Sequence, residues 1–220
     1  MMNPKVTAII PAHNEDKTIG DVVRIVKASE PIKEVIVVSD GSRDRTVREA
    51  KMAGARVVAL NKKQGKGQAM LAGLKQSNSQ VVLFLDADLI GLTQEHVERL
   101  VYPVVNGVKS MNVGMIDRGR VGNFIARHCP LISGERALKR EIVEAVPKEF
   151  MNGFMVENSL NYYCRTRKLG YGAIHLPGLS IRRKYDKVPL SEAVVQYLKM
   201  TFEILKGMFI VRIAYLIKRF

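Results

Sequence analysis

The first 90 residues alternate short apolar runs with segments that carry apolar residues at helical spacing, and this alternation constrains the fold more than any other feature. A short, mostly apolar run is typical of a strand that is covered on both faces. Strands that alternate with helices form βαβ units. We therefore predict an α/β fold with a mostly parallel central sheet flanked by helices. The four predicted strands cover residues 5–11, 34–39, 56–60 and 81–85.

The second half of the chain is less regular. A length of 220 residues suits one sizeable domain with a short appendage. We expect a domain over residues 1–189, divided into halves at residue 90, and one long helix over residues 190–220. Further helices are expected at 95–105 and from the starts of segments 132–140 and 156–168, and further strands at 109–115 and 173–180.

Two carboxylates, Asp86 and Asp88, directly follow the fourth apolar run. Open α/β sheets bind ligands outside the carboxyl ends of their strands. An Asp-x-Asp pair at that place can hold a divalent cation through oxygen ligands, and the cation can hold a diphosphate. The alternative is that the acids only cap the next helix. The motif by itself does not decide between these two interpretations.

Three other polar loops follow or precede the predicted elements of the first half. His13 and Glu15 follow the first strand, and Asp40 ends the second, where an acid can accept hydrogen bonds from a base or a ribose hydroxyl. Lys66 lies between two glycines just before a helix, where it can reach a phosphate, although a solvated turn has the same composition. In a parallel sheet these loops converge on one edge.

Together these loops resemble the family 2 glycosyltransferases of the GT-A fold, which include polyprenyl-phosphate and phosphoglycerate sugar transferases. The resemblance rests on residues 10–15 (IPAHNE), 38–46 (VSDGSRDRT), 65–67 (GKG) and 86–88 (DAD). It implies a Rossmann-like nucleotide-binding half and metal-dependent transfer of a sugar from a UDP- or GDP-sugar to an acceptor, with inversion. Mg²⁺ or Mn²⁺ is the implied cofactor.

The same resemblance implies roles for individual residues. Pro11, His13 and Glu15 would line the nucleoside pocket, and Asp40 would contact the base. Lys66 would lie near the ribose or the diphosphate. Asp86 would face the ribose or the metal, and Asp88 would be the direct metal ligand and, with Glu157, a catalytic residue. Ser39 is a departure, because the family commonly has an acid at that position.

The second half matches the family less closely. Ser133 and Gly134 resemble its acceptor-side segment, where small residues allow substrate to approach the backbone. Glu157 is the candidate general base, which would accept the proton of an attacking hydroxyl. Asn158 stands where the family often has a second acid. The alternative for Glu157 is an acid placed at a helix start by the helix dipole.

A third metal ligand and the contacts to the leaving diphosphate are also expected in the second half. His175 is the candidate ligand, with a half-buried core histidine as the alternative. Arg182 and Arg183 are the candidate diphosphate contacts, since arginine offers two parallel hydrogen bonds to an anion. Their alternative is a solvated loop.

The chain is strongly basic, with a net charge of +14. A phosphorylated substrate, an anionic membrane or nucleic acid would each explain this charge, but no basic-aromatic signature of an RNA-binding module is present, so no nucleic-acid partner is expected. The two cysteines have no metal-like spacing and indicate reduced thiols. The first residues lack an apolar signal core, which favours a cytoplasmic protein.

The tail from residue 190 carries apolar residues at steps of three or four. Lys206 and Arg212 interrupt it, so a membrane-spanning helix is not expected. It can lie on anionic lipid, or pack against the domain or a second subunit of a homodimer. The first arrangement would favour a polyprenyl phosphate acceptor and a peripheral location on the inner face of the cell membrane.

Two other functions fit parts of the pattern. A nucleotidyltransferase that makes nucleotide-sugars would carry a glycine-rich loop after the first strand, where this chain has Pro-Ala-His-Asn-Glu. A non-catalytic, membrane-docked protein that binds nucleotide-sugars would not need to keep Asp86, Asp88 and Glu157 together.

Overall fold

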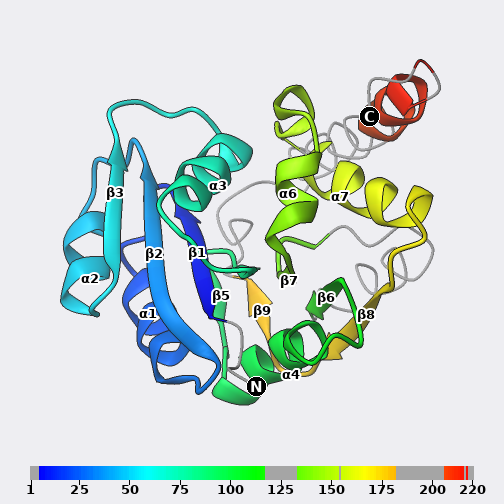
Figure 1. The fold of residues 1–220 in the computed structure, drawn as a ribbon. Helices are drawn as coiled ribbons and strands as arrows, with labels where there is room; N and C mark the ends of the chain where they lie inside the picture. The colour runs from blue at the N-terminus through cyan, green and yellow to red at the C-terminus, as the bar shows by residue number, and fades with distance from the viewer. Residues whose placement is uncertain (1–4, 117–132, 154, 182–205, 216, 218–220) are drawn as a thin grey trace, which may run out of the picture.

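A seven-stranded sheet with the strand order β3-β2-β1-β4-β7-β6-β8 forms the centre of the computed structural model (Figure 1). The structure describes residues 5–116, 133–153, 155–181, 206–215 and 217. The sheet strands are β1 (Val6–Ala12), β2 (Ile32–Asp40), β3 (Arg56–Leu60), β4 (Val81–Phe84), β6 (Met111–Ile116), β7 (Arg136–Lys139) and β8 (Tyr171–Leu176). A separate two-stranded sheet pairs β5 (Leu89–Ile90) with β9 (Ser180–Ile181).

The sheet is parallel except at one strand. β3, β2, β1 and β4 pair in parallel, as do β6 and β8, whereas β7 is antiparallel to both β4 and β6. All four predicted strands of the first half are present, each within two residues of its expected bounds at either end. The predicted α/β fold with a mostly parallel sheet is confirmed.

Helices cover both faces of this sheet. They are α1 (Ile19–Ala28), α2 (Thr46–Met52), α3 (Lys66–Lys75), α4 (Gln94–Val105), α6 (Arg140–Ala145) and α7 (Met155–Thr166), with a short 3₁₀ turn, η1 (Lys148–Phe150). Because successive side chains of a strand point to opposite faces, Val35 and Val37 of β2 join one apolar cluster and Ile36 and Val38 join the other.

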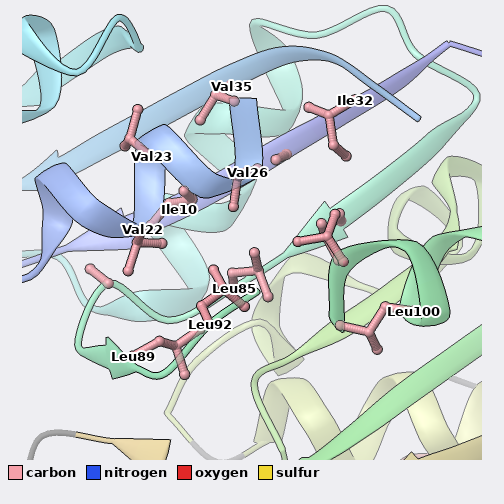
Figure 2. Close-up of a cluster of buried hydrophobic side chains, with 14 of the residues drawn as sticks. Ile10, Val22, Val23, Val26, Ile32, Val35, Leu85, Leu89, Leu92 and Leu100 are labelled. Carbon is pink, nitrogen blue, oxygen red and sulfur yellow. The ribbon is translucent and has the colours of Figure 1, made fainter. Parts of the chain in front are cut away.

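The first apolar cluster lies between the sheet and helices α1 and α4. Figure 2 shows part of it, in which Val22, Val23 and Val26 of α1 lie close to Ile10 of β1. The second cluster contains buried residues of α3, α6 and α7 on the other face. Burial on both faces explains why β1, β2 and β4 are nearly continuous apolar runs.

Segment 132–140 differs from its prediction as a helix start. Residues 136–139 form strand β7, and α6 begins only at Arg140. Ala137 packs into one apolar cluster and Leu138 into the other, and both side chains are fully buried. Pairing with β4 and β6 on either side decides this conformation, and neither partner is close in sequence.

The predicted strand at 173–180 is also divided. β8 ends at Leu176, and Gly178 adopts a positive φ of 77° in the turn that follows. β9 then pairs with β5, with Ile181 opposite Leu89. This pairing fixes residues 180–181 beside the segment that directly follows Asp88.

The described part of the tail, residues 206–215, is helical and packs against α7. Val211 and Ala214 are buried in the second cluster, and the rings of Tyr162 and Tyr215 meet edge to face at 5.4 Å. The rest of the predicted 190–220 helix, apart from residue 217, lies outside the described residues. In the part of the chain that the structure describes, no helix is long and apolar enough to cross a membrane.

Candidate active site

The loops after β1 and β2 meet at the carboxyl edge of the sheet, as the parallel pairing requires. The Nδ1 atom of His13 lies 2.7 Å from the carbonyl oxygen of Asp40. The Asn14 amide donates to Ser42 Oγ at 3.1 Å, and the Arg43 amide donates to Asn14 Oδ1 at 2.9 Å. Asn14 has a φ of 58°, a left-handed conformation that asparagine tolerates better than most residues.

Pro11 and Glu15 flank this junction. Pro11 is half-buried in β1, opposite Val38 of β2. The Glu15 amide donates to Thr46 Oγ1 at 2.8 Å, which joins the end of the first loop to the start of α2. Asp44 accepts hydrogen bonds from the Thr46 and Asp16 amides. Slight burial opposes ionisation, but the hydrogen bond from the Thr46 hydroxyl, together with those from the two amides, holds the pKa of Asp44 below its usual value.

The carboxylate of Asp40 is buried and holds the loop that leads into α3. One oxygen accepts the Gln64 amide at 2.6 Å and the other accepts the Gly65 amide at 2.8 Å. Gly65 has a φ of 93°, which only glycine adopts easily, and α3 begins at the next residue. The observed contacts therefore give Asp40 a direct part in positioning Lys66.

Lys66 joins the carboxylates of two distant segments. Its Nζ lies 2.5 Å from Asp86 Oδ1, at the end of β4, and 3.6 Å from Glu157 Oε1, in the first turn of α7. Partial burial favours the neutral amine, but the carboxylates of Asp86, Glu157 and Glu135 outweigh this effect and raise the pKa of Lys66. Lys66 is therefore a cation at neutral pH.

Gly134 lies directly against this ion pair. A Cβ atom at Gly134 would stand 2.3 Å from Lys66 Nζ and 2.7 Å from each Asp86 carboxylate oxygen. The antiparallel direction of β7 explains this proximity, because Arg136, at the start of β7, pairs with Phe84, near the end of β4. The segment containing Ser133 and Gly134 thus lies at the same sheet edge as Asp86.

Glu135 is a site residue that the sequence analysis did not predict. Its side chain is fully buried, and one carboxylate oxygen accepts the Ser133 hydroxyl. Burial, followed by the nearby charge of Asp86, raises the pKa of Glu135 to about 7, although Lys66 and the Ser133 hydroxyl act in the opposite direction. The sequence signal that could have indicated Glu135 is an acid placed directly before a buried strand.

Arg136 is a second buried cation, below the Ser133–Gly134 turn. Its Nε and Nη2 both donate to the Ser133 carbonyl, at 3.2 and 2.5 Å, and its Nη1 donates to Asn161 Oδ1 at 3.4 Å. Burial lowers the pKa of Arg136, with partial compensation from the carboxylates of Glu157 and Glu135. Arg136 thereby ties the turn to α7.

Asp86 and Asp88 do not cap the following helix, which removes the alternative considered above. α4 begins at Gln94, and its cap is Thr93, whose hydroxyl accepts the His96 amide at 3.2 Å. Asp86 and Asp88 are half-buried on either side of the buried Ala87.

Asp86 and Asp88 can supply carboxylate oxygens to a hard divalent cation, and further buried carboxylates lie nearby. Glu135 Oε1 and Glu157 Oε2 are buried and have no hydrogen-bond partner among the described residues. Among the described residues, the three carboxylates of Asp86, Glu135 and Glu157 lie close to the two cations Lys66 and Arg136. Oxygen-rich sites with one or two carboxylates suit Mg²⁺, which keeps positions for substrate phosphates.

The structure does not gather every predicted ligand. His175 is exposed on β8, which is separated from β4 by β7 and β6. Within the described residues no group of three or more histidine, cysteine or acidic side chains is arranged to hold a metal. The arrangement gives the His175 prediction no support. Arg182 and Arg183 lie outside the described residues.

A half-open pocket of about 80 Å³ lies between α7 and the helix over residues 206–215. Its lining includes Asn158, which is next to Glu157 in the chain, and two arginines, Arg165 and Arg212. The lining also includes Asn161, Tyr162, Tyr171, Met208 and Val211. Guanidinium groups and tyrosine hydroxyls are suited to a phosphate or a carboxylate.

Glu135→Gln should stabilise the metal-free protein in alkaline solution. Because the pKa of Glu135 is raised from 4.5 to about 7 in the folded state, the folded protein binds more protons than the unfolded chain between these values, and its stability falls as the pH rises through this window. The variant should melt higher than wild type at about pH 8, and the difference should disappear near pH 4.5. Thermal unfolding in EDTA measures this, with the exposed Glu95→Gln as control. A lower melting temperature for Glu135→Gln at both pH values would contradict the prediction.

Comparisons with known proteins identify the family. The model described as Glycosyl transferase family 2 matches residues 7–170. Glucosyl-3-phosphoglycerate synthase from Mycolicibacterium paratuberculosis is 32% identical over 85% of this chain and 67% of its own length. A 4,4'-diaponeurosporenoate glycosyltransferase from Staphylococcus aureus is 38% identical, but over only 43% of this chain and 27% of its own.

Solved structures agree with this result. Glucosyl-3-phosphoglycerate synthase from Mycobacterium tuberculosis, in complex with Mn²⁺, UDP-glucose and phosphoglyceric acid, has a TM-score of 0.78 at 27% identity and covers 94% of this chain and 79% of its own. The same enzyme with Mg²⁺ and UDP also has a TM-score of 0.78, at 26% identity. The chain belongs to glycosyl transferase family 2 and is a nucleotide-sugar glycosyltransferase with the GT-A fold.

Proposed function

We propose that this protein transfers glucose from UDP-glucose to a phosphorylated acceptor of the phosphoglycerate class, with Mg²⁺ or Mn²⁺ as cofactor and with inversion at the anomeric carbon. The observation that carries the proposal is the single charged cluster that joins Lys66 and Asp86 on the donor side to Gly134 and Glu157 on the acceptor side. The relatives whose structures contain UDP-glucose, Mn²⁺ and phosphoglyceric acid support this choice of substrates.

On the donor side, Pro11, His13 and Glu15 would line the nucleoside pocket. Asp40 would contact the base with the lone pairs that remain beside its two backbone hydrogen bonds. Asp86 and Asp88 would hold the metal ion, which when bound supplies positive charge to the leaving diphosphate. Lys66 lies close enough to Asp86 to neutralise the same diphosphate.

On the acceptor side, Glu157 would act as the general base. Its carboxylate is buried, and Oε2 has no hydrogen-bond partner among the described residues, so it can accept the proton of an attacking hydroxyl. Gly134 would let the ion pair of Lys66 and Asp86 pack directly against the backbone of the acceptor-side turn, because a side chain there would collide with it. Arg136 would keep the Ser133–Gly134 turn in place.

The pocket with Arg165 and Arg212 would take the phosphate of the acceptor. Asn158, the residue after Glu157, is among its lining residues. The hydroxyl of an acceptor held there would have to reach Glu157 from this pocket. The net charge of +14 is consistent with a substrate pair that is anionic on both sides.

A second candidate acceptor is a lipid-linked phosphate. The helix over residues 206–215 packs against α7 with one face, but Phe209, Ile213 and Ile217 form an apolar stripe on the other, with exposed fractions of 65%, 41% and 59%. Lys206 and Arg212 lie on the same helix. An exposed apolar stripe flanked by basic residues is suited to an anionic membrane surface, and a membrane location would bring the site to polyprenyl phosphate.

Asp88→Asn should abolish UDP release from UDP-glucose with Mn²⁺ and 3-phosphoglycerate, lowering the rate by roughly 100-fold or more, because the leaving diphosphate loses metal-borne charge. A coupled assay for UDP measures the rate, with 3-phosphoglycerate and polyprenyl phosphate in vesicles as alternative acceptors. The exposed Asp21→Asn serves as the control and should match wild type. If wild type turns over neither acceptor, the proposed substrates are wrong.

Arg165→Gln and Arg212→Gln should each raise the KM for the phosphorylated acceptor by roughly tenfold, the effect of losing one charge-assisted hydrogen bond. The KM for UDP-glucose should not change, because the pocket lies on the acceptor side. Steady-state kinetics with each substrate varied in turn make the distinction. The control is Arg167→Gln, an exposed change just after α7. An equal rise in both KM values would show that Arg165 and Arg212 do not bind the acceptor specifically.

Phe209→Asp and Ile213→Asp should weaken binding to vesicles that contain phosphatidylglycerol, because each places a charge in the apolar stripe. Flotation of the full chain measures binding, and the exposed Val108→Asp controls for added negative charge. Equal flotation of all forms would remove the membrane-surface proposal, and a change from dimer to monomer on size exclusion would favour a subunit interface instead.

A further inference from the structure

The ammonium of Lys66 neutralises Asp86, an acid of the proposed metal site. It lies 2.5 Å from Asp86 Oδ1, which is shorter than most ion-pair contacts, and 3.6 Å from Glu157 Oε1. Asp86 belongs to the donor half of the chain and Glu157 to the acceptor half. One side chain therefore supplies the positive charge for carboxylates on both sides of the site.

Three backbone segments near Lys66 hold its side chain in this position. Asp40 fixes Gly65 at the start of α3. A Cβ at Gly67 would stand 2.0 Å from the Met151 carbonyl, so α3 is held close to the segment that precedes α7. Gly134 covers the ammonium so closely that a Cβ there would lie 2.3 Å from Nζ. The side chain is nevertheless 32% exposed, which leaves it a direction in which to move.

A cation that already neutralises Asp86 competes with any second cation at the same carboxylate. A divalent ion bound by Asp86 would stand close to the ammonium, and like charges at such distances in a partly buried site repel strongly. A diphosphate changes this balance, because it offers the displaced ammonium a new anionic partner.

We propose that Lys66 is a resident cation that holds Asp86 and Glu157 together in the metal-free protein, and that a divalent ion displaces it from Asp86 toward the diphosphate. This inference rests on the proposed metal dependence and goes beyond it. The metal ion and the diphosphate then bind with positive coupling, because each improves the site for the other. Lys66 is a positioning residue for both, and it links donor binding to the contact with Glu157.

The test is the binding of Mn²⁺ alone, without donor or acceptor. Free Mn²⁺ is measured by electron paramagnetic resonance for wild type, Lys66→Met and Lys66→Arg. Lys66→Met removes the competing charge at similar length and should bind Mn²⁺ about tenfold more tightly than wild type. Lys66→Arg keeps the charge and should bind as weakly as wild type. Lys66→Gln is prepared as a second neutral variant, so that the result does not depend on one protein folding well.

The coupling is measured by repeating the titration with saturating UDP. Wild type should gain Mn²⁺ affinity on adding UDP, and Lys66→Met should gain much less, because no ammonium has to be relocated. Lys63→Met removes one positive charge from an exposed position in the same loop and controls for the change in net charge. It should behave as wild type in both titrations.

The outcomes separate this inference from the proposed function. If wild type binds Mn²⁺ with UDP but Lys66→Met and Lys66→Gln bind Mn²⁺ alone no more tightly than wild type, Lys66 is only a diphosphate ligand and the inference is overturned while the proposed function stands. If Lys63→Met tightens Mn²⁺ binding equally, the effect is one of net charge and the inference again fails. If wild type binds neither Mn²⁺ nor UDP, the metal-dependent function is wrong, and the inference falls with it.

Discussion

The ammonium of Lys66 holds the two halves of the site together, because it pairs with Asp86 on the donor side and with Glu157 on the acceptor side. Asp86 lies shortly after β4, in the parallel half of the sheet, and Lys66 is the first residue of α3. Glu157 reaches the same ammonium from α7. Because three carboxylates and two cations share this partly buried region, each charge depends on the placement of the others. A cation or an anion that binds here therefore changes the electrostatic energy of every charged group in the cluster.

A single reversed strand makes this cluster possible. In a wholly parallel sheet, the segment before a strand lies at the edge opposite the ligand-binding loops. β7 runs against its neighbours, so Ser133, Gly134 and Glu135 arrive at the same edge as Asp86. The buried guanidinium of Arg136 then fixes the turn by holding the Ser133 carbonyl. Acceptor-side residues thereby meet donor-side residues at one edge of the sheet.

The helix over residues 206–215 forms one wall of the pocket beside α7. Its inner face closes a pocket that carries Arg165 and Arg212, and its outer face presents Phe209, Ile213 and Ile217. The two acceptor classes considered for the protein correspond to these two faces, since a small phosphorylated acid needs only the pocket, whereas a lipid phosphate also needs a membrane beside it.

The parallel half of the fold and the convergence of its loops could be predicted from the residues alone, because apolar runs, helix periodicity and strand-end acids are local signals, and a parallel sheet brings its strand ends to one edge. The sequence also indicated the family through residues 10–15, 38–46, 65–67 and 86–88. Four features became visible only in the folded chain: residues 136–139 are a strand, Asp40 anchors the loop before Lys66, Glu135 joins the site, and His175 lies on an edge strand away from Asp86. The physical reason is that these features depend on pairing and burial between segments far apart in the chain, and no local pattern encodes which distant carboxylate an ammonium will meet.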